Sequence, residues 1–126
     1  MALTAPQPSL AEAERVLSKA VVRAAQFLDI SNATLAKVLG VSEATASRLG
    51  REKFTLQSGS KPFELAQLFV RLFRGLTAIT GGDDAASRSW LLSRNSALRD
   101  RPIDLIQSIE GLLRTLNYVD SRRARI

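Results

Sequence analysis

Apolar residues recur at intervals of three and four along the first part of the chain. They run from Leu10 to Leu28, with the spacing of one buried face of an α-helix. Ser9 stands immediately before this stretch and Glu12 follows three residues later, which is the order of residues in a capping box. The pattern therefore predicts a first helix over residues 10–28.

Two shorter helices are predicted next, joined by a tight turn. We expect Asn32 to cap the second helix and Gly40 to end it, because asparagine is a preferred N-cap residue and glycine tolerates a positive φ. Ser42 is placed to cap a third helix that reaches Leu49 or slightly beyond. Turn-forming residues near position 60 then close an N-terminal part that spans residues 1–60.

A fourth helix, over about residues 62–80, is apolar around most of its circumference. Its apolar positions are Phe63, Ala66, Phe69, Val70, Leu72, Phe73, Leu76 and Ile79. A helix of this kind is buried on more than one side. It is therefore either the central helix of the fold or part of a self-association surface, and the two alternatives are compatible. We assign residues 61–82 as a connecting and dimerisation helix.

The C-terminal part, residues 83–126, follows a glycine pair. Asp83 or Asp84 is expected to start a fifth helix, and residues 93–101 read as a loop. Pro102 suits the first turn of a sixth helix. The predicted apolar face of that helix consists of Ile103, Ile106, Ile109 or Leu113, Leu112, Leu116 and Val119. Because no segment alternates with the period of a strand, the predicted fold class is all-α, with about six helices.

Residues 32–51 have the spacing of a helix-turn-helix. Ala36 is small enough for two short helices to cross closely, Gly40 permits the sharp turn, and Val41 fills the space between the helices. The inner faces would be made by Leu35, Leu39, Ala46 and Leu49. The stretch resembles the Xre/lambda-repressor-like helix-turn-helix, in the form L-A-x-x-L-G-V-S-x-x-T-x-S-R.

In motifs of this kind the second helix lies in the major groove of DNA and presents its early residues to base edges. The candidate DNA-binding residues face outward and are Ser42, Glu43, Ala44, Thr45, Ser47, Arg48 and Arg51. Arg48 and Arg51 can pair with guanine edges or with phosphates, and the sequence leaves that choice open. One monomer would read too short a site, so a homodimer on paired half-sites of an operator is expected. The alternative is a hairpin that serves as a scaffold or a protein interface.

Composition narrows the function further. The chain has 126 residues, a formal net charge of +6, and neither cysteine nor histidine. It therefore lacks the ligands of a Cys/His zinc site and the imidazole of a Ser-His-Asp triad. It has no phosphate loop either, so we expect a protein that is not an enzyme and uses no cofactor. The absence of disulfides fits a reducing cytoplasm, and we expect neither a signal peptide nor a membrane span.

The C-terminal part resembles the toxin-binding domain of the Xre/MbcA/ParS antitoxin family. The resemblance rests on the order Trp90-Leu91, Asn95-x-x-Leu98, Pro102-x-x-Leu105 and Glu110-Gly111. It implies an antitoxin of a type II toxin–antitoxin system that neutralises a RES-domain toxin, which consumes NAD, and represses its own operon. It also implies that the C-terminal region covers the NAD pocket of the toxin. The candidate toxin-binding residues are Trp90, Asn95, Arg99, Arg101, Gly111, Arg122, Arg123 and Arg125.

Several of these residues also have a purely structural interpretation. Trp90 at helical spacing is typical of a core residue, and Asn95 is placed to cap the end of the fifth helix or the turn after it. Gly111 inside a helix indicates the close approach of either a neighbouring helix or the toxin. At the level of function, the alternative is a stand-alone dimeric transcriptional repressor whose C-terminal segment merely dimerises.

Overall fold

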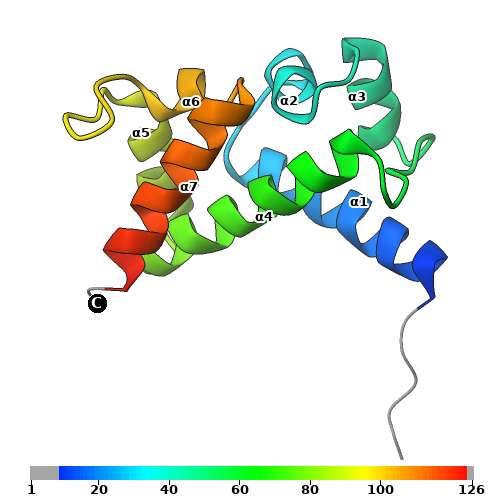
Figure 1. The fold of residues 1–126 in the computed structure, drawn as a ribbon, viewed down its shortest axis with the longest axis horizontal. Helices are drawn as coiled ribbons and strands as arrows, with labels where there is room; N and C mark the ends of the chain where they lie inside the picture. Colours follow the sequence, from blue (N-terminus) through cyan, green and yellow to red (C-terminus); the bar gives the residue numbers. More distant parts are fainter. Residues whose placement is uncertain (1–8, 125–126) are drawn as a thin grey trace, which may run out of the picture.

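The computed structural model describes residues 9–124 (Figure 1), which fold into α-helices with no β-strand among them. The helices are α1 (Leu10–Phe27), α2 (Asn32–Leu39), α3 (Glu43–Gly50), α4 (Lys61–Ile79), α5 (Asp84–Leu92), α6 (Pro102–Leu105) and α7 (Ile109–Arg123). The predicted all-α class, with an N-terminal helix-turn-helix followed by a C-terminal helical part, is confirmed. Within the described range no helix is both long enough and apolar enough to cross a bilayer.

Side-chain caps define the starts of most helices. The Ser9 hydroxyl accepts a hydrogen bond from the Glu12 amide at 3.1 Å, as the capping pattern predicted. The predicted cap of the second helix was wrong by one residue: the Ser31 hydroxyl accepts from the Thr34 amide at 3.2 Å, and Asn32 is the first helical residue. Both residue types cap well, so the choice depends on the backbone, which is extended at Ser31.

The predicted sixth helix is divided in two, so the described part of the chain has seven helices and not six. The division follows Leu105, and Ser108 caps a new helix by accepting a hydrogen bond from the Gly111 amide at 3.0 Å. A Cβ atom on Gly111 would collide with the Leu105 carbonyl group. The glycine therefore allows the end of α6 to fold back against the first turn of α7.

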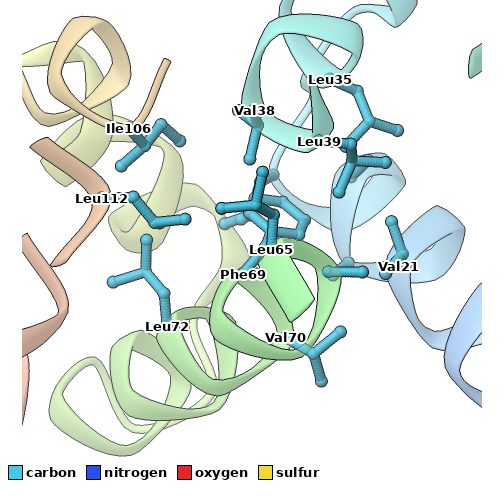
Figure 2. Close-up of a cluster of buried hydrophobic side chains, with 14 of the residues drawn as sticks. Val21, Leu35, Val38, Leu39, Leu65, Phe69, Val70, Leu72, Ile106 and Leu112 are labelled. Atoms are coloured by element: carbon cyan, nitrogen blue, oxygen red, sulfur yellow. The ribbon is translucent and has the colours of Figure 1, made fainter. Parts of the chain in front are cut away.

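Helix α4 is the central helix of the fold. It crosses the molecule, with α1 and α2 packed against one end and α5 and α7 against the other (Figure 1). Helix α3 packs on α1 and α2, and α6 packs on α5 and α7. Phe69 is fully buried, and Figure 2 shows it near the centre of the core, with Val38 of α2 above it and Leu112 of α7 to its left. This burial within a single chain confirms the first of the two alternatives for the fourth helix.

One apolar core joins the N-terminal and C-terminal helices. Its buried members come from α1 to α5 and α7, and from three positions that follow helices: Leu28 after α1, Leu56 after α3 and Ile106 after α6. Polar contacts reinforce the junction: Arg71 of α4 forms an ion pair with Asp120 of α7, and the Arg88 guanidinium of α5 donates to the Phe27 carbonyl at 3.0 Å. The two parts of the sequence therefore pack as one body.

Candidate functional site

Helix α3 presents a polar face to solvent, as the helix-turn-helix pattern predicted. Its inner residues Ala46 and Leu49 are 0% and 2% exposed. Gly40 ends α2 with a φ of 70°, and Val41 packs half-buried in the turn. All seven candidate DNA-binding residues lie on the other side of α3 or at its two ends: Ser42, Glu43, Ala44, Arg48 and Arg51 are exposed, and Thr45 and Ser47 are half-buried.

Hydrogen bonds organise the first two turns of this face. The Ser42 hydroxyl accepts from the Thr45 amide at 3.1 Å and lies 3.0 Å from the Thr45 hydroxyl. Arg48 donates from Nη2 to that same Thr45 hydroxyl at 3.1 Å. A guanidinium has five N–H donors, so Arg48 keeps further donors for a base edge or a phosphate. Thr45 thus acts as a positioning residue for Arg48.

Residues on α5 and α7 form a stacked group at the other end of the molecule. Trp90 is half-buried and stacks on Tyr118, with ring centroids 6.3 Å apart and an interplanar angle of 18°. Arg122 donates to the Tyr118 hydroxyl at 3.0 Å, and its guanidinium carbon lies 5.9 Å from the centroid of that ring. Trp90 and Arg122 therefore meet through Tyr118, which was not among the predicted site residues although it lies one helical turn before Arg122.

The loop over residues 93–101 is held by Asn95. Its Oδ1 atom accepts hydrogen bonds from the Ala97 and Leu98 amides, both at 2.9 Å. Asn95 therefore caps the turn that follows α5, which was one of its two predicted structural roles. The loop exposes Arg99, which has a φ of 64°. Arg101 pairs with Asp104 at 2.9 Å, and this hydrogen bond raises the pKa of Arg101.

Gly111 is buried against the chain's own backbone at Leu105. The close approach predicted from a glycine inside this helix is therefore made by the backbone of the chain itself, at Leu105. Along the rest of α7, Arg122 and Arg123 are exposed, whereas Arg125 lies outside the described residues.

Two apolar side chains on α7 face solvent. Ile109 is 53% exposed and Leu113 is 40% exposed, while Leu112, Leu116 and Val119 make the buried face of the helix. The sequence pattern had placed Ile109 or Leu113 on that inner face. Their spacing of four residues puts them on one side of α7, where they form an apolar pair available to a partner.

Two family models match the chain, in an order that agrees with the structure. Residues 7–71 match the antitoxin Xre-like helix-turn-helix domain. Residues 75–125 match the antitoxin Xre/MbcA/ParS C-terminal toxin-binding domain. Comparison with curated proteins finds no matching relative. Because the first match covers slightly more than half of the 126 residues, and the second covers most of the remainder, the chain belongs to the antitoxins with an Xre-like helix-turn-helix domain.

Proposed function

We propose that this antitoxin neutralises a RES-type toxin that consumes NAD and that it represses its own operon. The observation that carries the proposal is the presence of both matched domains on one chain, each with an outward-facing polar surface. The protein acts by binding and has no catalytic role. It works in the cytoplasm, where both the operator and the NAD pool are found.

Repression begins with the insertion of α3 into the major groove of the operator. Arg48 offers the donors for a bidentate contact with a guanine edge, and Ser42 and Ser47 suit contacts with phosphates. Arg51, at the C-terminal end of α3, is exposed and reaches either a base or the backbone. Each subunit of a homodimer reads one half-site, and the pair provides the specificity that a single motif lacks.

Neutralisation uses the C-terminal helices. The exposed apolar pair Ile109 and Leu113 supplies apolar area for an interface, while the guanidinium of Arg122 is held above Tyr118. Arg122 and Arg123 are suited to pair with acidic side chains at the mouth of the toxin's NAD pocket, because guanidinium groups form bidentate hydrogen bonds with carboxylates. We infer that the C-terminal end of α7 lies over that pocket and blocks the entry of NAD.

The proposal is tested by co-expressing the full chain with the neighbouring gene, whose product is the expected toxin. Cells that express the toxin alone should lose NAD and stop growing, and cells that also express this chain should keep both. Arg48→Ala should protect as well as the unaltered chain while it releases repression, because Arg48 lies on the DNA-binding face. If no neighbouring gene product reduces cellular NAD or binds this chain, the protein is instead a stand-alone dimeric repressor.

A further inference from the structure

A basic cleft lies beside α3, and apart from Arg51 the proposed function does not use the residues that line it. It has a volume of about 820 Å³ and lies between α1 and the segment that follows α3. Arg15, Lys19 and Arg23 line it from α1, and Arg51 lines it from the end of α3. One carboxylate, that of Glu52, lines the same cleft.

The three α1 cations are arranged along one face of the helix. They are four residues apart, so they follow each other at about one turn and extend over roughly 12 Å. All three are exposed, as is Arg51. Within residues 9–124, none of the four forms a salt bridge. The cleft therefore carries positive charge that the described part of the chain does not neutralise.

The walls of the cleft are fixed by hydrogen bonds that span a long stretch of sequence. The Leu56 amide donates to the Ser18 hydroxyl at 3.0 Å, and the Ser58 amide donates to Glu14 Oε2 at 2.7 Å. The second bond also directs the Glu14 carboxylate to the backbone and not to a cation of the cleft. Because these bonds hold the segment after α3 against α1, the backbone positions that carry the positive charges are fixed before any ligand binds.

We propose that this cleft binds the phosphate backbone of DNA next to the bases that α3 reads. The inference rests on the proposed operator binding, and it adds a second contact surface to it. Arg51 lines the cleft and is also the exposed C-cap of α3, three residues after Arg48, so the cleft adjoins the proposed DNA-binding face. A row of cations at regular spacing suits a polyanion of regular spacing such as a DNA strand. Contacts of this kind position the protein and add affinity without reading sequence.

The test compares two double variants of the full chain. Lys19→Gln/Arg23→Gln removes two charges from the cleft, and the matched control Arg74→Gln/Arg94→Gln removes two exposed charges from α4 and the loop after α5. Binding to operator DNA and to a scrambled duplex is measured between 50 and 200 mM salt, with circular dichroism to verify the fold. The slope of log Kobs against log salt is negative, and each lost phosphate contact lowers its magnitude by about 0.9.

We expect the cleft variant to lose about 3.6 from the magnitude of that slope, because each subunit of the proposed homodimer loses two phosphate contacts, and to weaken on both duplexes alike. As salt rises from 50 to 200 mM, its affinity should then fall about 150-fold less than that of the unaltered chain. Glu52→Gln should strengthen binding to both duplexes, a gain that damage to the fold cannot produce. The control variant should keep the slope of the unaltered chain.

An unchanged slope in the cleft variant, with specific binding retained, would overturn the inference and leave operator binding by α3 intact. If the cleft variant keeps DNA binding but loses toxin binding, the inference is also overturned, because the cleft would then bind an acidic surface of the toxin. If the unaltered chain shows no preference for any segment upstream of its operon, the proposed repression is wrong. The cleft is then tested by comparing the salt slopes of the unaltered chain and the cleft variant on the scrambled duplex.

Discussion

Gly75 of α4 lies directly beneath Val119 of α7, so close that a Cβ atom on the glycine would stand 2.6 Å from Val119 Cγ1. Both residues are buried, and Val119 is 0% exposed. The missing side chain sets how near the C-terminal helix can come to the central helix. Helix α7, which the family match assigns to the toxin-binding domain, can therefore pack this closely only because α4 has no side chain at Gly75.

Gly75→Ala should destabilise the chain by about 1–3 kcal/mol, because an added methyl group forces α7 away from a well-packed core. Helix propensity alone would favour alanine, so the sign of the change distinguishes the two effects. Urea unfolding followed by circular dichroism measures it. The double variant Gly75→Ala/Val119→Ala should recover part of the loss, and a Gly75→Ala chain as stable as the parent would contradict the close approach.

Ser18→Ala should cost about 1–3 kcal/mol, because it leaves the buried Leu56 amide without its hydrogen-bond acceptor. The matched control is Ser93→Ala, which removes an exposed hydroxyl bonded to the Ser89 carbonyl and should change stability little. The midpoint temperature of thermal unfolding measures the change in stability of each variant. Equal midpoints for the two variants would show that this hydrogen bond does not hold the segment after α3.

Arg48→Ala should weaken operator binding by about 1–3 kcal/mol if Arg48 makes a bidentate base contact. Gel shifts at one fixed salt concentration, with operator and scrambled duplexes side by side, measure the loss of preference. Arg74→Ala, on the exposed side of α4, is the control. Thr45→Val should produce a smaller loss in the same direction, because it removes the hydroxyl that holds the Arg48 guanidinium. A preference that survives in Arg48→Ala would move base reading to Arg51.

Arg122→Gln/Arg123→Gln should reduce protection of cells that express the toxin, while DNA binding and helical content stay unchanged. Substitution is preferable to deletion of residues 119–126, because Val119 is fully buried and its removal would damage the core. The assay follows both NAD loss and complex formation, with Arg74→Gln/Arg94→Gln as the charge-matched control. Full protection by the double variant would place the inhibitory surface on Ile109 and Leu113 instead.

The unaltered protein is expected to be a homodimer at micromolar concentration, as light scattering coupled to gel filtration would measure. Phe69→Asp cannot test the role of α4 in that dimer, because Phe69 is 0% exposed and a buried carboxylate would unfold the chain. Phe73 is half-buried, stacked on Phe27 with centroids 5.9 Å apart. Phe73→Asp should therefore yield a folded monomer, and a folded dimer would exclude this side of α4 from the interface.

The helix-turn-helix could be predicted from the sequence because its determinants are local. Gly40 supplies the left-handed turn and Ser42 the cap, and both act on residues within one helical turn. The inward positions of Ala46 and Leu49 then follow from the helical period, and the outward face follows from them. The same reasoning found the first and fourth helices to within about two residues at each end.

Features that depend on distant contacts could not be predicted in the same way. The break after Leu105 is the exception, because its carbonyl packs on Gly111 only six residues later; here the apolar spacing that continues across the break concealed it. The stacking of Trp90 on Tyr118 joins residues on two separate helices. The basic cleft brings Arg51 to the side of Lys19, and no spacing rule connects positions so far apart in the chain.

Helix α4 belongs to both halves of the molecule, since one family match ends at residue 71 and the other begins at residue 75, within its unbroken length. The orientation of α7 relative to α3 is therefore set by one continuous helix and not by a flexible linker. On an operator with half-sites about 34–36 Å apart, the two subunits of the proposed homodimer would present their toxin-binding helices at a distance and angle dictated by the pitch of the duplex. A promoter whose half-sites were moved by half a turn would place the second half-site on the opposite side of the DNA, where the same dimer could not engage it.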